Sequence, residues 1–299
     1  MESVKKLKVT TLADNLTFHP SLLGQWGLSI LLQIESIDGR EHTILIDTGA
    51  EKEALLFNID RLKVSLRRLE AIVLSHGHAD HTAATVELAR RSRRKVQVIA
   101  HPYVFKRRYV VTRKGKKVFG RVPKGEREKN IERAGAQLIF TKEPYQIIPG
   151  VITTGEIPRQ TSFERIPGRR FICVGRQPQR DHILDDQAVI VNVRGQGAWV
   201  FSGCAHSGII NTLRRVRSIA PSLSIYAIVG GMHLVSRNES GIKPVVNALR
   251  SYAPKLVSPC HCTGFRATGM IWQAFQRQFV LNFSGRTIMS WKMTRENLV

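Results

Sequence analysis

The chain has 299 residues, 42% of them hydrophobic and 23% charged, which is typical of a folded globular protein with a substantial core. No apolar run is long enough to span a membrane, and the start, MESVKKLKVT, lacks the apolar segment of a signal peptide. We therefore expect a cytoplasmic protein with no membrane partner. Four cysteines are too few for a disulfide scaffold, and we expect them to be core residues or metal ligands.

Positive charge is in excess and is unevenly distributed. The sequence has 46 Lys and Arg against 23 Asp and Glu, and residues 90–133 alone hold 17 basic and 3 acidic residues, a net +14. Such a cluster attracts nucleic acid, acidic lipid or a phosphorylated substrate, although a solvated surface is an equally good interpretation. Aromatic residues are sparse here, which does not favour a stacking platform for single-stranded nucleic acid.

Predicted strands and helices alternate along the chain. Short apolar runs between turns predict strands at residues 28–36, 43–49, 71–75, 96–102, 137–141, 150–155, 188–193, 198–203, 225–231 and 255–262. Amphipathic stretches predict helices at residues 82–92, 126–135, 207–220 and 243–253. This order predicts a single α/β domain over residues 1–299, an αββα four-layer sandwich with a basic insert at about residues 102–133. A doubly wound sheet is the alternative.

The segment SHGHADH, from Ser75 to His81, follows a buried-type strand and contains four potential metal ligands: His76, His78, Asp80 and His81. A strand end directs side chains into a crevice, and imidazoles with a carboxylate suit zinc, or else manganese or iron. In extended geometry the first two histidines point the same way, while the last two ligands reach a second point, so we expect one or two ions. Two adjacent ions would lower the pKa of a water between them, and these four residues are expected to carry catalysis.

The pattern H-x-H-x-D-H after a strand, with LIDTG upstream at Leu45–Gly49, resembles the metallo-β-lactamase superfamily. FSGCAHSG (residues 201–208) and VSPCHCTG (residues 257–264) lie where that family places its later ligands. The resemblance implies that His76 and His78 are first-site ligands. It implies four second-site or bridging ligands: Asp80, His81, Cys204 and His261. It places Asp47 beneath the metal loop, as a residue that orients the ligands without binding metal.

One ligand position stays open. The family's third motif usually supplies a histidine after a glycine at a strand end, whereas GVITTGEIPR has Glu156 there. His206 is the alternative from another direction, and an incomplete or single-metal site is a third option. Other histidines and cysteines are interpreted as packing, surface or rim residues: His101, His182, Cys173 and Cys262.

Shorter motifs narrow the resemblance. They are DN at residues 14–15, GLS at 27–29, TGEIPR at 154–159, DDQA at 185–188, SGCAHSGIINT at 202–212, GGMHL at 230–234 and PCHCTG at 259–264. The set resembles the subfamily named for 7,8-dihydropterin-6-methyl-4-(β-D-ribofuranosyl)aminobenzene-5′-phosphate synthase, a dihydropteroate-synthase-like activity. The resemblance implies a metal-dependent hydrolase or transferase acting on a small phosphorylated or pterin-like substrate.

Both reactions need a pocket for an anion. The helix that begins near residue 207 would offer free backbone N–H groups to a phosphate, and a glycine pair would let a ligand approach the backbone closely. A histidine after that pair is either a substrate contact or a buried, hydrogen-bonded group, and an arginine with the basic segment would steer the anion inward. The candidates are Ser207, Gly208, Gly230, Gly231, His233 and Arg159.

Two other functions stay open. A phosphodiesterase or nuclease of the same fold is favoured by the charge, and salt-dependent nucleic-acid binding with cleavage lost on chelation would indicate it. A non-catalytic metal-binding protein would fold intact without metal. The sequence predicts neither the exact substrate nor the oligomeric state.

Overall fold

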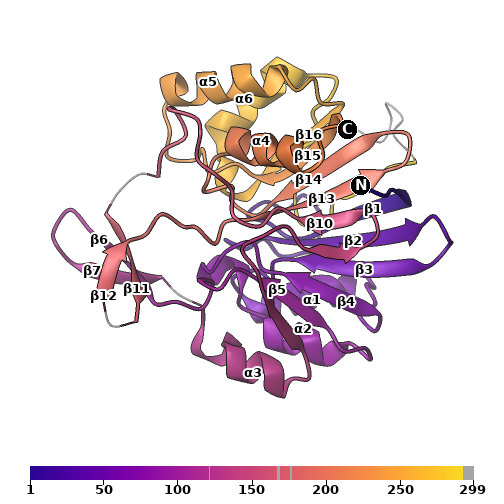
Figure 1. Ribbon diagram of the computed structural model, residues 1–299, viewed down its shortest axis with the longest axis horizontal. Helices are drawn as coiled ribbons and strands as arrows, with labels where there is room; N and C mark the ends of the chain where they lie inside the picture. Colours follow the sequence, from indigo (N-terminus) through magenta and orange to yellow (C-terminus); the bar gives the residue numbers. More distant parts are fainter. Residues whose placement is uncertain (121, 167–168, 176, 292–299) are drawn as a thin grey trace.

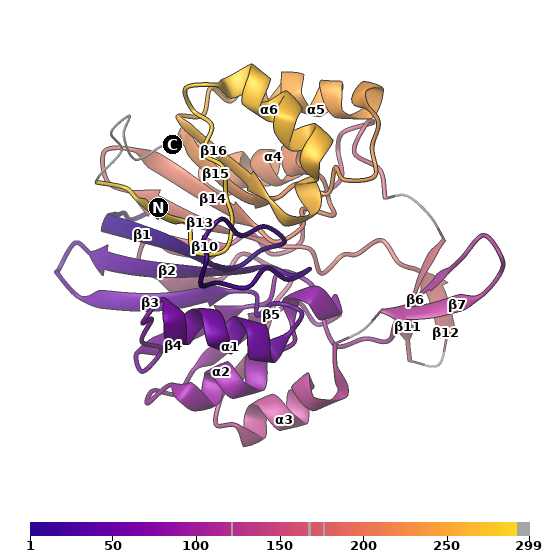
Figure 2. The ribbon, with the colours of Figure 1, turned by 180° about the vertical axis from the view of Figure 1, so that it is seen from behind.

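Helices outside and strands inside form four layers (Figure 1), and the computed structural model describes residues 1–120, 122–166, 169–175 and 177–291. Three helices cover one outer face: α1 (Lys52–Arg61), α2 (Thr85–Arg91) and α3 (Glu128–Arg133). Three cover the other: α4 (Ile209–Ile219), α5 (Glu239–Arg250) and α6 (Phe265–Phe275). Figure 2 shows the same layers from behind. The predicted αββα sandwich is therefore confirmed. Among the described residues, no helix has the length and apolar character needed to cross a membrane.

The strands of the sandwich form one hydrogen-bonded array in the order β16-β15-β14-β13-β1-β2-β3-β4-β5-β8. One half contains β1 (Val4–Ala13), β2 (Ser29–Ser36), β3 (Glu41–Ile46), β4 (Leu69–Val73), β5 (Gln97–Ala100) and β8 (Gln137–Phe140). The other contains β13 (Ala188–Val193), β14 (Gly197–Ser202), β15 (Ile225–Gly231) and β16 (Leu256–Cys260). Shorter strands are added at β9 (Gln146–Ile148), β10 (Val151–Thr153) and β17 (Thr287–Met289). The halves meet where Val4 of β1 pairs with Val193 of β13.

Three clusters of buried apolar side chains explain the layers. The central cluster joins the two halves and includes Leu32 and Trp199. A second joins the first half to its helices and includes Leu31 and Leu55, and a third joins the second half to α4–α6 through residues such as Leu213. Leu31 and Leu32 belong to different clusters because successive side chains of a strand point to opposite faces. Each half is thus apolar on both faces, as a sheet between two layers must be.

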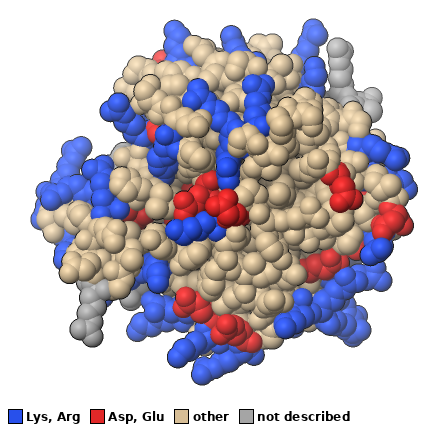
Figure 3. All heavy atoms as spheres, viewed as in Figure 1, with Lys and Arg blue, Asp and Glu red and all other residues tan. Residues whose placement is uncertain are grey.

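A separate four-stranded antiparallel sheet projects from the sandwich, at the left of Figure 1. Its strands, in the order β12-β11-β6-β7, are β6 (Arg108–Val111), β7 (Lys117–Gly120), β11 (Arg170–Val174) and β12 (Gln177–Arg180). The basic segment thus supplies half of this projecting sheet, and a later segment supplies the rest. Tyr109 stacks on Phe171 with ring centroids 5.2 Å apart, which ties the two parts together. Lys and Arg side chains crowd this region (Figure 3).

Candidate metal centre

Loops from both halves bring the candidate ligands to one edge of the sandwich. Strands β3 and β4 run parallel, as do β14, β15 and β16, so the carboxyl ends within each set lie together. Asp47 follows β3, and the short helix η1 (Ala79–His81) lies in the loop after β4. Cys204 and His206 follow β14, and the short helix η3 (His261–Thr263) follows β16.

The first cluster consists of His76, His78 and His206. His76 Nε2 lies 2.9 Å from His78 Nδ1, and His206 Nε2 lies 3.2 Å and 3.1 Å from these two atoms. Two nitrogen ligands of a tetrahedral zinc ion are separated by about 3.3 Å, since each Zn–N bond is about 2.0–2.1 Å long. Burial lowers the pKa of all three imidazoles, that of His78 to about 3, so they are neutral and have lone pairs to share.

Hydrogen bonds determine which ring nitrogen of His76 carries the proton. The hydroxyl of Ser75 donates to Asp47 Oδ2 at 2.6 Å, so its oxygen is left to accept from Nδ1 of His76 at 2.9 Å. A proton on Nδ1 leaves Nε2 as the lone pair that faces the other two histidines. Asp47 also accepts from the backbone N–H of Ser75 at 2.7 Å, which fixes the start of the metal loop.

The second cluster consists of Asp80, His81, Cys204 and His261. Asp80 Oδ2 lies 3.7 Å from His81 Nε2 and 3.6 Å from His261 Nε2, and Cys204 Sγ lies 3.2 Å from His81 Nε2. Burial disfavours a proton on His81, but the carboxylates of Asp47 and Asp80 outweigh it and raise its pKa to about 9. The cluster therefore favours positive charge at this point, which a metal ion would supply as well as a proton.

An unpartnered atom tests whether a metal fits the second cluster. His261 Nδ1 lies 2.9 Å from Asn15 Oδ1, an acceptor, which places the proton on Nδ1 and the lone pair on Nε2. That Nε2 is buried, and the described residues give it no hydrogen-bond partner. Buried polar atoms are seldom left unsatisfied, and a cation beside Asp80 and His81 would satisfy this one. The residues present thus fit a metal ion.

Cys204 stands between the two clusters. Its ligand atom lies within 4.8 Å of those of His76 and His206, and equally of those of His81 and His261. Burial raises the pKa of its thiol well above the usual value, so only a strong positive charge would hold it as a thiolate. If Cys204 were a ligand in both clusters, a positive charge would be required in each of them.

The backbone around the centre is strained. Four residues without the freedom of glycine have a positive φ there: Asp47 (58°), Ala205 (52°), His233 (48°) and His261 (51°). Such conformations cost about 1–3 kcal/mol each and cluster at functional sites. A Cβ on Gly203 would lie 2.0 Å from Ser75 Oγ, so a glycine is required where the loop after β14 crosses the loop after β4.

Of the two candidates for the open ligand position, the structure brings His206 to the first cluster and not Glu156. Glu156 instead lies 2.8 Å from His101 Nε2 and 3.5 Å from Lys142 Nζ. Because Tyr103 donates its backbone N–H to His101 Nδ1, the Nε2 proton of His101 faces the carboxylate. Glu156 is therefore paired with His101 and Lys142 and does not face the first cluster.

The anion pocket expected at Ser207 and Gly208 does not fit the contacts there, because the N–H groups are already occupied. Asp186 accepts from Ser207 N at 2.8 Å. Glu164 accepts from Ile210 N at 2.9 Å and from Asn211 N at 3.0 Å. Two carboxylates thus take the place at the start of α4 that a phosphate would occupy.

The glycine pair and Arg159 also serve the protein itself. A Cβ on Gly230 would lie 2.0 Å from Ser202 O, and one on Gly231 would lie 2.3 Å from Gly203 O, so the close approach is to a neighbouring strand and not to a ligand. Arg159 donates to the carbonyls of His206 and His182. These contacts explain the glycine pair without a ligand, whereas the Nε of Arg159 is buried without a hydrogen-bond partner among the described residues, and a substrate role for Arg159 stays a prediction.

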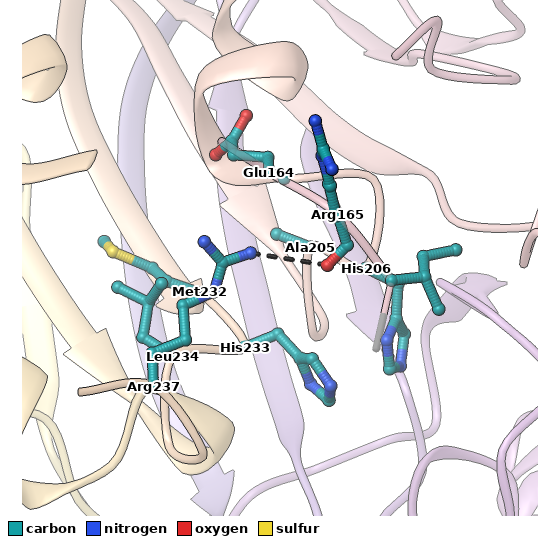
Figure 4. Close-up of a pocket in the computed structure, with 10 residues that line it drawn as sticks. Glu164, Arg165, Ala205, His206, Met232, His233, Leu234 and Arg237 are labelled. Atoms are coloured by element: carbon teal, nitrogen blue, oxygen red, sulfur yellow. Dashed lines mark hydrogen bonds between the residues drawn. The ribbon is translucent and has the colours of Figure 1, made fainter. Parts of the chain in front are cut away.

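His233 lies beside the first cluster, with its ring centroid 4.1 Å from that of His206 (Figure 4). Its buried Nδ1 has no hydrogen-bond partner among the described residues. The pocket that both histidines line has a volume of about 10 Å³, which is room for about one water molecule. This side of the centre therefore has a narrow pocket.

Three residues that support the metal loop were not singled out from the sequence. Arg108, at the start of β6, is buried and pairs with Asp181 at 2.9 Å and Asp185 at 2.5 Å. Asp185 in turn accepts from the backbone N–H of Gly77 at 2.7 Å, which ties the basic segment to the loop. Asn15 orients His261 through the hydrogen bond to its Nδ1. Asn15 lies in the motif DN and Asp185 in the motif DDQA, so these two motifs were the sequence features that could have identified them.

Comparison with known proteins identifies the class. Residues 28–159 match the family model described as the metallo-beta-lactamase superfamily. The solved structure of Tm1679, described as a metal-dependent hydrolase of the beta-lactamase superfamily, has the same fold, with a TM-score of 0.76, 21% identity and coverage of 94% of this chain and 98% of that chain. YhfI from Bacillus subtilis, a metallo-beta-lactamase fold protein, has a TM-score of 0.55 at 13% identity and covers 96% of this chain and 100% of its own. The chain belongs to the metallo-β-lactamase superfamily, as its motifs predict.

Within that class, two proteins of Methanocaldococcus jannaschii are similar over nearly the whole chain. One is 7,8-dihydropterin-6-methyl-4-(beta-D-ribofuranosyl)-aminobenzene-5'-phosphate synthase, 30% identical over 290 residues, 95% of this chain and 97% of the relative. The other is an uncharacterized protein, 29% identical over 282 residues, 94% of this chain and 99% of the relative. The predicted resemblance to the synthase subfamily is thereby confirmed.

Proposed function

We propose that the protein is a metal-dependent enzyme that acts on a small phosphorylated or pterin-like substrate, as a hydrolase or a synthase-type transferase. The observation that supports it best is the buried Nε2 of His261, which has no hydrogen-bond partner among the described residues and lies 3.6 Å from Asp80, next to a second set of converging imidazoles. The name of the similar synthase, with its dihydropterin, aminobenzene and 5′-phosphate, supports the choice of substrate class.

The donor set favours zinc, with manganese or iron as alternatives, since imidazole and thiolate are preferred zinc ligands. His76, His78 and His206 would hold the first ion, and a second set would hold the other: Asp80, His81, Cys204 and His261. Bound ions would act as Lewis acids on a phosphoryl or pterin oxygen. Asp47 fixes the proton of His81 on Nδ1, and Asn15 does the same for His261, so both rings keep a lone pair toward the ions.

Metal content of the purified protein tests the first half of the proposal. Replacing Asp80 and His261 together with alanine should lower the bound metal without unfolding the chain. The matched control replaces Asp60 and His19, an exposed aspartate and an exposed histidine, with alanine. Metal stoichiometry that is the same in wild type and both double variants would contradict the assignment.

Turnover tests the second half. The enzyme is given 6-hydroxymethyl-7,8-dihydropterin pyrophosphate with and without 4-(β-D-ribofuranosyl)aminobenzene 5′-phosphate, the amine that the name of the similar synthase implies, and released pyrophosphate is measured. Release that requires the amine indicates a transferase, and release without it indicates a hydrolase. No release under either condition, in protein with full metal content, contradicts a pterin substrate and leaves other small phosphorylated molecules to be tested by phosphate release.

The projecting sheet favours one other candidate, a phosphodiesterase or nuclease. It adjoins the metal loop, because Arg108 and Arg170 line one pocket with His78 and Asp80, and Arg108 is connected to the loop through Asp185 and Gly77. Cleavage of single-stranded nucleic acid that is lost on chelation, together with binding that weakens steeply with salt, would establish this function in place of the first.

A further inference from the structure

A large apolar cavity opens beside the candidate metal centre. It has a volume of about 780 Å³, within the usual size range of small-molecule sites, and it lies between the N-terminal loop, the end of β16 and helix α6. Its walls carry aromatic side chains with large exposed fractions: Phe18 (65%), Trp26 (58%), Phe265 (97%) and Trp272 (54%). Exposed apolar surface on this scale generally marks a binding site.

The cavity differs in charge from the rest of the molecule. None of the described residues that line it is Asp, Glu, Lys or Arg, in a chain whose formal net charge is +23. An uncharged occupant is therefore favoured over a phosphate. Flat aromatic walls favour a planar ring, because stacked and edge-on ring pairs add attraction beyond the burial of area.

Besides His261, a second lining residue has a polar atom without a hydrogen-bond partner among the described residues. Asn282 is 1% exposed, and its Oδ1 accepts from Thr11 Oγ1 at 2.7 Å and from Phe283 N at 2.9 Å. These two donors fix the amide orientation, and the remaining Nδ2 has no hydrogen-bond partner among the described residues. A buried N–H group costs about 1–3 kcal/mol when unsatisfied, so an occupant with a carbonyl or ring nitrogen is favoured.

The cavity is continuous with the metal centre through His261, which belongs to both. The ring of Trp26 lies 5.6 Å from the ring of His261, centroid to centroid, and Asn15, which orients His261, also lines the cavity. An occupant therefore has one end against the aromatic walls and the other at the second cluster of metal ligands.

We propose that this cavity binds the uncharged heteroaromatic ring of the substrate, a hydrogen-bond-accepting ring of the pterin type, and directs the reacting end toward His261. This assignment rests on the proposed function, which it deepens by placing the ring. A second protein chain is the other occupant to test, and the lack of charged residues in the lining does not distinguish it from a ring, so the experiment must do so.

The test measures binding of 6-hydroxymethylpterin, which has the ring but no phosphate, by calorimetry to the metal-containing protein. Trp272→Ala removes a wall and Asn282→Asp removes the donor while keeping an acceptor for Thr11 and Phe283. We expect each to raise the Kd about tenfold, the effect of roughly 1.4 kcal/mol. The control is Trp291→Ala, which removes an equally exposed tryptophan (46%) beside Lys6, outside the cavity, and should leave the Kd unchanged.

Thermal unfolding, metal content and sedimentation are measured on the same samples. Weaker pterin binding in folded, metal-replete Trp272→Ala protein supports the assignment. Equal Kd values for wild type and Trp272→Ala, or no pterin binding to wild type, overturn it. A dimer that Trp272→Ala converts to a monomer, without pterin binding, also overturns it and identifies the cavity as an interface between copies. Metal content and turnover of the wild-type protein decide the proposed function separately, because neither measurement depends on where the ring binds.

Discussion

Asp47 is the residue whose substitution most directly tests how the protein orients its metal ligands. The carboxylate is fully buried, and three donors reach it: Ser75 N at 2.7 Å, Ser75 Oγ at 2.6 Å and His81 Nδ1 at 2.6 Å. In Asp47→Asn the amide oxygen keeps the bond from Ser75 N. The amide nitrogen, however, faces two donors at the position of Oδ2.

Two donors cannot face each other without cost, so the rings of His81 and His76 must both change the nitrogen that carries the proton. His81 can no longer donate from Nδ1, so it must lose the proton there and keep one on Nε2, the atom that faces Cys204 and Asp80. Ser75 must accept from the introduced amide nitrogen and donate to His76, which reverses that ring as well. Loss of such a supporting group typically weakens metal binding about 10–100-fold. Hydrogen bonds to a charged group are worth about 1.5–3 kcal/mol, so we expect the metal-free protein to lose about 2 kcal/mol of stability.

Glu164→Gln is the matched control. Glu164 is also a buried carboxylate with three donors, namely Ile210 N, Asn211 N and Thr161 Oγ1, but it touches no candidate metal ligand. Chelator-competition titrations and urea unfolding are measured for both variants. We expect a similar loss of stability in both and weaker metal binding in Asp47→Asn alone. Equal metal affinity in the two variants would refute the idea that Asp47 sets the tautomers.

Three further predictions concern the cysteines, the basic segment and pH. Cys204→Ser should release metal, increasingly so as the pH falls and protons compete, whereas Cys173→Ser should bind as wild type does; equal behaviour would make Cys204 a packing residue. Neutralising the exposed Lys106 and Arg107 should lower kcat/KM for an anionic substrate at low salt and leave kcat unchanged; a salt-insensitive fall in kcat would place them at the reacting group. Burial raises the pKa of Glu164 above 4.5, so its contribution to stability is complete below that pH and is lost as the pH rises through the folded-state pKa. The stability gap between wild type and Glu164→Gln should therefore shrink as the pH rises above about 4.5, and a gap that widens would contradict the sign.

Sequence periodicity identified most of the sandwich because its strands are apolar on both faces. The predicted strand at residues 188–193, for example, coincides with β13, all six of whose residues are buried. β1 was missed because lysines interrupt it at Lys5, Lys6 and Lys8, although it is the strand where the two halves meet. The helix α6 was also missed, and so was β17, which follows the strand predicted at residues 255–262.

The sequence pattern did not predict the projecting sheet, for a different reason. β7 and β12 are exposed throughout and β11 is half-buried, so no buried face imposes a period of two on their residues. Pairing between segments about sixty residues apart then forms the sheet, and no local pattern records it. Arg108 illustrates the consequence, because a residue counted as part of a solvated charge cluster is 3% exposed and anchors that sheet to the metal loop.

The third ligand of the first cluster shows how backbone geometry replaces a missing motif residue. In a regular strand, residues two apart point to the same side, so Cys204 and His206 would face one point together. Ala205, at φ 52°, instead turns the chain between them. Cys204 then lies within reach of both clusters, while His206 Nε2 faces His76 and His78 alone. One loop after β14 thus brings a ligand to each place where the family pattern would draw on two loops. The loop that contains Glu156 is left to pair with His101 and Lys142. Neither the spacing C-A-H nor any propensity records this turn, which explains why sequence reasoning left His206 and Glu156 undecided.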